Sequence, residues 1–525
     1  MRTLLLTVSV LALLAGCRKD GEPADAGGAR PLRVVKYAPA SIDPGASRDQ
    51  QGRALIEDLF EGLLARSAAG VPGAGAATAW SAAPDGLSWT FTLRPNLVWS
   101  DGTPLTAEDW VWSLRRALLP ETANPQAEML WPIKNARALN EGKLAAGQDL
   151  GVSAPRPDTL VIALERPYPL LPRLMSTAYA MPVPRHVVEK HGKDWTRPEH
   201  MVSNGPYVLK EHKNEQAMVL ERNPKFHDAA GVAIESVSIR FTKNLDDARK
   251  WFELGEVDWV DNLLTSDAVR ELKGRPELRV DDYDGVSYLL LNNARPPFDD
   301  VLVRRAFDLG IDRERLARQL LGGGEKAAVM PIPPGMTTLR PASRVRYDPA
   351  KARALLAEAG YGPSRPFPAV ELAFNTNERN KLLCEFYQRN LHEALGVDVR
   401  LTAMEWGSFL ARAESRDYGI AQLQLVGGLD ALEPLDMLTT GSVANRPHYA
   451  NPEFDAIVEK VRRAGTLAER DQAIAQGLAV LDRDVPLLSV FTLTAKALLK
   501  PGLEGYEANS DNLHPIRWMR FAERP

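Results

Sequence analysis

SWTFTLR at residues 88–94, followed by WSDGTPLTAED at residues 99–109, gives the strongest structural signal in the chain. The second segment predicts a turn that leads into a capped helix, because Thr106 and Asp109 have the spacing of a capping box. An apolar run that starts at Trp110 then continues the helix. We expect the tryptophans of this region to pack in the core rather than to line a ligand pocket. They are Trp89, Trp99 and Trp110.

Outside this region, helix and strand signals alternate along the chain, which is typical of an α/β fold. A helix is predicted to begin at Asp348, an aspartate cap followed by proline, and to end at Gly360. Apolar residues of the segment 55–64 recur at helical spacing and predict a further buried helical face. Strands are predicted at residues 33–37, 397–402, 420–426 and 486–493.

Length and composition limit the class of protein. The chain has 525 residues, a formal net charge of -4, 45% hydrophobic residues and 25% charged residues. A single hydrophobic core rarely extends over a chain of this length, so two or three lobes are expected. The near-neutral charge gives no electrostatic basis for binding nucleic acid.

The first residues predict an exported protein. An apolar run at residues 4–15 is too short to span a bilayer and is typical of a signal peptide. It ends in LAGC, which resembles a bacterial lipobox, so we predict that residues 1–16 are removed and that Cys17 is lipidated. Ordinary secretory cleavage beside an incidental cysteine is the alternative. Residues 17–30 then form the lipidated cysteine and a flexible tether, which predicts a periplasmic or cell-surface protein anchored to a membrane.

Motifs of catalysis and metal binding are missing from the sequence. It contains no HExxH, GxSxG or CxxC pattern, and the glycines at residues 322–324 lack the spacing of a phosphate loop. Cys384 is the only cysteine besides Cys17, so we expect no internal disulfide and a buried, inert thiol at Cys384. These features predict a binding protein without cofactor or metal, and not an enzyme.

Several segments resemble the peptide/nickel family of ABC-transporter solute-binding proteins, known as family 5. The two segments quoted first are similar to its TFxLRxxxxWSDGxPxTAxD signature. The similarity runs in order from about Arg33 to the C-terminus and is closest to the oligopeptide-binding branch. These motifs identify the scaffold and do not themselves bind the substrate. The others are DLFEGL at 58–63, SNGPY at 203–207, ERNP at 221–224, NNARPPFDD at 292–300, VRRA at 303–306, AGY at 359–361 and EW at 405–406.

The resemblance implies an α/β, bilobal periplasmic-binding-protein fold of type II, in its three-domain variant, with ligand buried between hinged lobes. It also implies a monomer that captures short peptides and passes them to the permease of an ABC importer. The implied domains are a discontinuous lobe I at residues 31–62, 186–285 and 497–525, an extra domain II at 63–185, and lobe III at 286–496.

In the oligopeptide-binding branch, an extended peptide pairs with the backbones of two protein segments, which is β-augmentation. The resemblance places the pairing positions of one segment at Val426 and Gly428, and a carboxylate for the peptide's α-ammonium at Asp430. A carboxylate suits this role because burying an unpaired ammonium is costly.

The opposite wall of the implied site comes from earlier parts of the chain. Arg48 and Gln50 follow an IDP turn and fall on positions that line the site in the family. Tyr283 and Tyr288 fall on positions that line the pocket in family members.

Four positions depart from the family's pattern. Gly427 stands where the best-known member has a tryptophan. Gln424 and Asn380 replace an arginine and a histidine that receive a peptide carboxylate, so the means of binding the far end of the ligand has changed. Arg48 replaces an acidic residue, and we hypothesise that it supplies the lost positive charge, since guanidinium suits a carboxylate. A solvated surface arginine is the alternative.

Other functions stay open on the same scaffold. The solute can be a nickel chelate, an oligosaccharide or an opine-like compound, although the glycine at 427 argues against the aromatic-rich site of a sugar binder. A sensor lipoprotein that presents peptide without transport is a second class. An extracytoplasmic hydrolase is a third, and it would turn peptides over rather than retain them.

Overall fold

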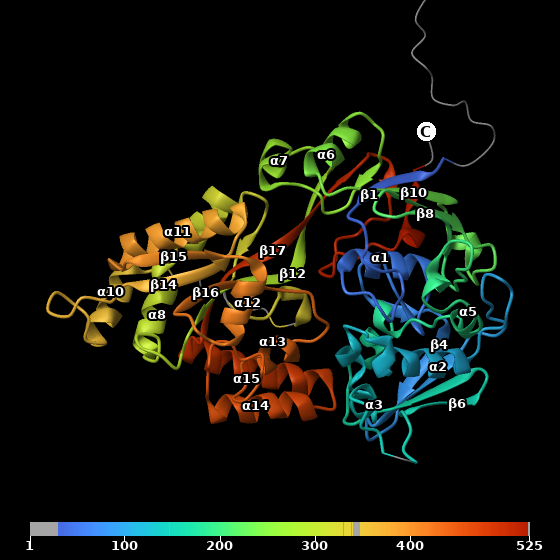
Figure 1. Ribbon diagram of the computed structural model, residues 1–525, viewed down its shortest axis with the longest axis horizontal. Coiled ribbons are helices and arrows are strands. Elements are labelled where there is room, and N and C mark those ends of the chain that lie inside the picture. Colours follow the sequence, from blue (N-terminus) through green and yellow to red (C-terminus); the bar gives the residue numbers. More distant parts are fainter. Residues whose placement is uncertain (1–29, 146, 329, 338, 340–346, 523–525) are drawn as a thin grey trace, which may run out of the picture.

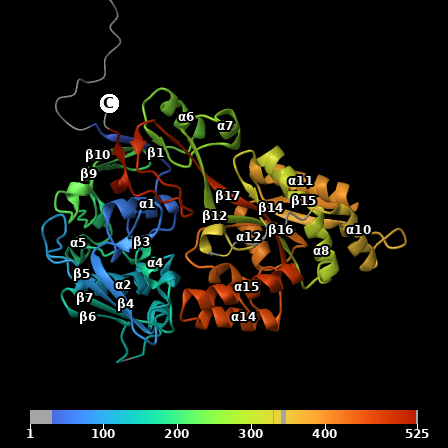
Figure 2. The same ribbon diagram turned by 180° about the vertical axis from the view of Figure 1, so that it is seen from behind.

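The computed structural model describes residues 30–145, 147–328, 330–337, 339 and 347–522. Figure 1 shows two folded bodies joined by two long strands, and Figure 2 shows the same arrangement from behind. We call residues 30–277 together with 500–522 the N-terminal body, and residues 292–486 the C-terminal body. The connecting strands are β12 (Leu278–Leu291) and β17 (Leu487–Leu499).

Of the predicted signal peptide and tether, residues 1–30, the structure describes only Arg30. The predicted signal peptide and Cys17 lie outside the described residues. Arg30, the last residue of the predicted tether, forms an ion pair with the buried Asp258. Within the described ranges, no helix is both long and apolar enough to cross a membrane.

The connecting strands make both bodies part of one continuous sheet. β12 pairs antiparallel with β17 over most of its length, and the register shifts between Tyr283 and Val286 and again between Ser287 and Tyr288. Such irregularities bend a strand and increase its twist. The main path of the sheet runs in the order β15-β14-β16-β12-β17-β11-β1-β10-β9-β8.

In the N-terminal body, the sheet is centred on β1 (Leu32–Lys36), which confirms the predicted first strand. Its sequence LRVVK is apolar because β1 pairs in parallel on both edges, with β10 and with β11. Helix α1 (Gln50–Leu59) follows, and the Asp49 side chain caps it by accepting a hydrogen bond from the Gly52 N–H at 2.6 Å. The other strands are β8 (Tyr207–Lys213), β9 (Ala217–Arg222), β10 (Ser236–Phe241) and β11 (Trp259–Val260).

The region quoted first builds a second sheet of the N-terminal body. SWTFTL forms β5 (Ser88–Leu93), and the predicted turn and capping box lead into α2 (Ala107–Leu118) with Thr106 as cap. Trp99 and Trp110 are fully buried as expected, while Trp89 is partly buried against the same core. The sheet order is β4-β5-β7-β6. The remaining strands of this sheet are β4 (Ala77–Ala82), β6 (Val152–Arg156) and β7 (Thr159–Ala163).

The predicted helical face at residues 55–64 is only half right. Its apolar residues are buried, but α1 ends at Leu59 and Phe60 is extended, with φ −128° and ψ 152°. The Leu64 N–H donates to the Met175 carbonyl at 3.2 Å instead of to a helical partner, and that carbonyl lies 2.7 Å from where a Cβ on Gly62 would stand. The apolar run therefore continues into a strand, β2 (Leu64–Arg66).

In the C-terminal body, three strands extend the sheet beyond β12: β14 (Val370–Asn375), β15 (Val399–Met404) and β16 (Ile420–Val426). Cys384 is fully buried in α11, and burial raises the pKa of its thiol. Because the thiolate is the reactive form, a raised pKa fits the predicted inert packing role. The longer helices here are α8 (Val301–Gly310), α10 (Pro349–Glu358), α11 (Glu378–Leu395), α12 (Trp406–Glu414), α14 (Pro452–Arg463) and α15 (Leu467–Asp484).

Short elements complete the chain. The helices are α3 (Ala136–Asn140), α4 (Leu171–Leu174), α5 (Arg185–His191), α6 (Leu245–Glu253), α7 (Ser266–Glu271), α9 (Arg313–Leu316) and α13 (Leu432–Asp436). The strands are β3 (Pro72–Ala74), β13 (Lys326–Ala327), β18 (Leu503–Glu504) and β19 (Arg520–Phe521).

Candidate ligand-binding site

The strand β16 has an edge with no strand beside it. On one side it pairs antiparallel with β12 from Ile420 to Val426. On the other side it pairs with β14 only at Ile420 and Ala421, so residues 422–426 have no second strand partner in the described part of the chain. The N–H and C=O groups of such an edge are what an incoming extended peptide pairs with.

Two glycines end this edge and turn the chain away. Gly427 (φ 75°) donates its N–H to the Asp284 carbonyl at 2.7 Å, and Gly428 has φ 128°. A Cβ on Gly428 would collide with Met336 and lie 2.7 Å from a Glu433 carboxylate oxygen, whereas a Cβ on Gly427 would meet nothing within 4 Å. Only glycine fits position 428, and the space beside Gly427 is open.

Asp430, the expected ammonium anchor, already has a cation. Its side chain is 7% exposed and forms an ion pair with Arg470 of α15, which is 3% exposed. The same carboxylate also accepts a hydrogen bond from the Leu432 N–H at 2.9 Å. The role of Asp430 toward a ligand stays a prediction, and any bound ammonium would share this carboxylate with Arg470.

Glu433 is a second carboxylate of this segment, and the sequence interpretation passed over it. It accepts the Leu429 N–H at 3.0 Å but forms no ion pair with any described residue. Burial raises its pKa to about 7, with a further contribution from the charges of Asp430 and Glu128. Because Glu128 belongs to the N-terminal body, that body contributes to the electrostatics of this carboxylate. The signal was present in the sequence as the glutamate of DALEP.

Gln50 and Tyr283, two of the predicted lining residues, meet in the structure. The Tyr283 hydroxyl donates to the Gln50 side-chain oxygen at 3.1 Å. The Gln50 amide donates in turn to the Asn512 carbonyl at 2.8 Å. The start of α1, the connecting strand β12 and the C-terminal segment are thereby tied together.

Other predicted residues have different surroundings. Tyr288 is buried in the C-terminal body and its hydroxyl donates to the Pro331 carbonyl at 2.9 Å. Asn380 is also buried and donates to the Asn375 side chain at 2.5 Å. A ligand-facing role for either side chain stays a prediction.

The remaining predicted residues keep accessible side chains. Val426 is 50% exposed at the end of the β16 edge. Gln424, on the same edge, is half-buried. Arg48 is exposed, and its side chain makes no hydrogen bond or ion pair with the described residues.

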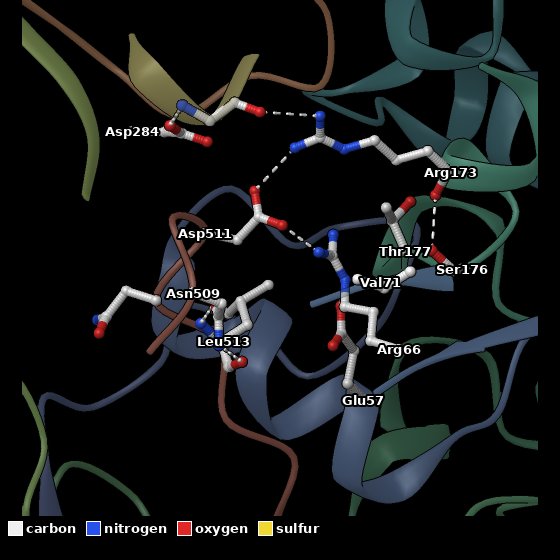
Figure 3. Close-up of polar contacts among 12 residues, drawn as sticks. Glu57, Arg66, Val71, Arg173, Ser176, Thr177, Asp284, Asn509, Asp511 and Leu513 are labelled. Atoms are coloured by element: carbon white, nitrogen blue, oxygen red, sulfur yellow. Dashed lines mark hydrogen bonds and ion pairs between the residues drawn. The ribbon is translucent and has the colours of Figure 1, made fainter. Parts of the chain in front are cut away.

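A cluster of buried charges joins the N-terminal body to the C-terminal segment (Figure 3). Asp511 forms ion pairs with Arg66 of β2 and with Arg173 of α4, the latter at 3.3 Å. Arg66 also lies 3.2 Å from the carboxylate of Glu57 on α1. We call Glu57, Arg66, Arg173, Asp284 and Asp511 the junction cluster.

The junction cluster also reaches the connecting strand and the loop beyond it. The Asp284 carboxylate accepts the Gly335 N–H at 2.7 Å, and the Asp284 N–H donates to the Ser510 carbonyl at 2.7 Å. Arg173 donates to the Gly335 carbonyl at 3.4 Å. Figure 3 shows Arg173 pointing between Asp511 and this loop, so one guanidinium links both bodies.

Burial and ion pairing shift the pKa values of the acids in the junction cluster in opposite directions. Burial raises the pKa of Glu57 to about 7, although Arg66 opposes the shift. Burial and the charge of Asp511 raise the pKa of Asp284. Burial acts the same way on Asp511, but Arg66 and Arg173 overcome it and hold its pKa below the usual value.

The sequence profile described as bacterial extracellular solute-binding proteins, family 5 Middle, matches residues 72–446. The chain belongs to this family of solute-binding proteins. The resemblance inferred from the motifs is therefore confirmed, and the members to which the chain is similar are binding proteins rather than enzymes.

Curated relatives of this family 5 protein cover most of its length. The periplasmic oligopeptide-binding protein OppA of Escherichia coli is 33% identical over 89% of this chain and 87% of its own. The periplasmic murein peptide-binding protein MppA of Escherichia coli is 32% identical, covering 91% and 90%. The probable deoxycholate-binding periplasmic protein YgiS of Escherichia coli is 31% identical, covering 91% of both chains.

Solved structures of the family confirm the fold. The unliganded open form of the murein tripeptide-binding protein MppA superposes with a TM-score of 0.84 at 30% identity, covering 94% of this chain and 97% of that chain. Haemophilus influenzae OppA in complex with RPPGFSPFR gives a TM-score of 0.74 at 27% identity, covering 94% and 100%. The protein thus has the bilobal, three-domain α/β fold of type II periplasmic binding proteins, as predicted.

Proposed function

We propose that this protein captures short peptides outside the cytoplasm and delivers them to an ABC importer. The unpartnered edge of β16, residues 422–426, is the observation that carries the proposal. A peptide added to this edge would bind through its backbone and so tolerate many side chains. The relatives named for oligopeptides and murein peptides support the same class of ligand.

The proposed mechanism uses the predicted domains. Lobe I (31–62, 186–285 and 497–525) with domain II (63–185) would close against lobe III (286–496) around the peptide, and the closed form would be recognised by the permease. Val426 and Gly428 would pair with the ligand backbone, and Asp430 would receive its ammonium. No step breaks a bond of the ligand.

The proposal also places the protein at a membrane surface as a monomer held by lipid on Cys17. Cys17→Ser removes the sulfur that would carry the lipid. We expect the variant to be recovered in the soluble fraction, whereas the unaltered protein sediments with membranes. Membrane retention of both forms in a fractionation experiment would contradict lipid anchoring.

Binding through the peptide backbone can be tested directly. The protein is incubated with a library of tri- to pentapeptides, desalted, and the retained peptides are identified by mass spectrometry. We expect stoichiometric, intact peptides, and loss of binding when a retained peptide is resynthesised with N-methylated backbone amides, which cannot pair with an edge strand. Sustained cleavage, or retention of N-methylated peptides with unchanged affinity, would contradict the proposal.

A different solute is the second candidate, because a relative of 31% identity is named a probable deoxycholate-binding protein. Calorimetry with deoxycholate, in the absence of peptide, separates the two. Tight binding of deoxycholate together with no retained peptide would favour this candidate.

A further inference from the structure

Arg53 on α1 is a half-buried cation that forms no ion pair within the described part of the chain. Its guanidinium lies 5.9 Å from the centre of the Tyr179 ring, and its side chain forms no hydrogen bond or ion pair with any residue of the described ranges. Ordering a long cationic side chain while removing part of its hydration costs free energy. An uncompensated cation in such a position is available to bind an anionic group.

Three other arginines of the candidate site and the junction cluster are paired. Arg66 has Glu57 and Asp511, Arg173 has Asp511, and Arg470 has Asp430. Glu57 stands one turn after Arg53 on α1, at the spacing of a helical ion pair, yet its carboxylate lies 3.2 Å from Arg66 instead. Glu57 therefore pairs with Arg66, and although the charge of Arg53 also lowers the pKa of Glu57, no ion pair between them forms.

Arg53 also lies beside residues that the sequence assigned to the ligand site. Gln50 precedes it by three residues on α1, so the two side chains share a helical face, and Gln50 is hydrogen-bonded to Tyr283 at 3.1 Å. Burial raises the pKa of Tyr283 to about 12, and the charge of Arg53 pulls in the opposite direction, which places Arg53 within electrostatic reach of that ring. Arg53 therefore lies 5.9 Å from the centre of the Tyr179 ring and one helical turn from Gln50, the partner of Tyr283.

We propose that Arg53 binds a carboxylate of the ligand. The proposal rests on the proposed function and names the chemistry of one end of the peptide. A guanidinium presents two parallel N–H donors that match the two oxygens of a carboxylate, and the Tyr179 ring beside it limits the directions in which the guanidinium can point. Arg53 would thereby replace the positive charge that is missing at Gln424 and Asn380.

The carboxylate has two possible sources, the peptide C-terminus or an acidic side chain. The test uses the peptides retained from the library, each resynthesised with a free C-terminus and as the C-terminal amide, and with Glu or Gln at each internal position. Calorimetry compares the unaltered protein with Arg53→Gln, Arg53→Lys and Arg48→Gln. Arg185→Gln, on the exposed surface of α5, is the control for loss of an arginine as such.

We expect the unaltered protein to bind the free form about 10- to 100-fold more tightly than the amide, the range for a charge-assisted hydrogen-bonded pair. Arg53→Gln should bring this ratio close to one, Arg53→Lys should keep part of it, and Arg185→Gln should leave it unchanged. If Arg53→Gln instead removes a preference for the Glu peptide over the Gln peptide, the carboxylate belongs to a ligand side chain.

Three results would overturn the proposal. In the first, Arg53→Gln still prefers the free peptide to its amide and the Glu peptide to the Gln peptide. In the second, these preferences are lost only in Arg48→Gln. In the third, the unaltered protein shows neither preference. Retention of no peptide at all would instead refute the proposed function. A ratio of affinities is used because general loosening of the fold weakens both peptides alike, and thermal unfolding confirms that each variant is folded.

Discussion

Asp430 and Arg53 carry opposite charges in the two bodies, and their surroundings differ. Asp430 lies in the C-terminal body and is paired inside the protein with Arg470, both side chains being less than 10% exposed. Arg53 lies in the N-terminal body, half-buried, 5.9 Å from the centre of the Tyr179 ring and without an ion pair to any described residue. A buried pair of this kind holds two segments together, whereas an unpaired cation is available to a ligand.

The comparison separates structural charge from charge that is free for binding. Breaking a buried ion pair leaves one charge uncompensated and is strongly destabilising. Removing an unpaired cation leaves no uncompensated charge in the protein, so the substitution should affect ligand binding and not folding. The predictions below test this separation for the C-terminal body.

Arg470→Met should give the largest effect. It leaves the Asp430 carboxylate buried without its cation, and we expect the free energy of unfolding to fall by about 3–5 kcal/mol in urea titrations. Arg463→Met is the matched control, because its pair with Glu459 lies on the surface of α14 and should be worth less than about 1 kcal/mol. Equal losses in the two variants would show that the pair of Asp430 has no structural role.

N-acetylation of the ligand should give the next effect, if Asp430 binds an ammonium in addition to Arg470. Truncating one partner of a buried charge pair costs about 2–5 kcal/mol, so acetylated peptides should bind the unaltered protein roughly 30- to several-thousand-fold more weakly. Asp430→Asn should weaken the free peptide and abolish the difference. An unchanged affinity on acetylation, measured by calorimetry, would leave Asp430 with its structural pair alone.

Gly428→Ala should cost about 1–3 kcal/mol of stability, because φ is 128° and the new Cβ would meet Met336 and Glu433. Gly427→Ala is the control, since its φ of 75° is left-handed but nothing lies within 4 Å of a Cβ. We expect a loss of only about 1 kcal/mol there. Thermal unfolding of both variants measures the difference, and a larger loss at Gly427 would contradict the account of this turn.

Glu433 should contribute a pH dependence of stability. Its pKa is raised from 4.5 to about 7, so between these values the folded state holds a proton that the unfolded state has lost. Stability should therefore fall by up to about 3 kcal/mol as the pH rises from 4.5 to 7, since each pKa unit corresponds to about 1.4 kcal/mol. Glu433→Gln should remove this component, while Glu459→Gln on the surface of α14 should preserve it. Parallel pH profiles for both variants and the unaltered protein would exclude Glu433 as the source.

Local signals predicted much of the fold. The capping box at Thr106 and Asp109 starts α2, and β16 runs over the predicted residues 420–426. The last strand was predicted at residues 486–493, but β17 continues to Leu499. Its last residues cross into the N-terminal body, where Leu498 and Leu499 pair with β11, a partner that no local pattern indicates.

The candidate site was less predictable because its chemistry depends on residues far apart in the sequence. Arg470 lies 40 residues from Asp430, and no local pattern indicates that they pair. The sequence predicted that Tyr288 lines the pocket, but no local pattern indicates that its hydroxyl donates to the Pro331 carbonyl. Arg53 was overlooked because the lack of a partner is a property of the folded chain alone.

The position of Asp511 has a consequence for the order of assembly. Asp511 is 445 residues from Arg66, and the two meet in the first body to be synthesised. Contacts this distant carry a large cost of loop closure and form late. Glu57 and Arg66 can pair with each other early, but Arg173 has its carboxylate partner, Asp511, only when almost the whole chain has been made. A product truncated before residue 511 would keep unbalanced charge at the core of its N-terminal body, and proteases should distinguish it from the complete protein.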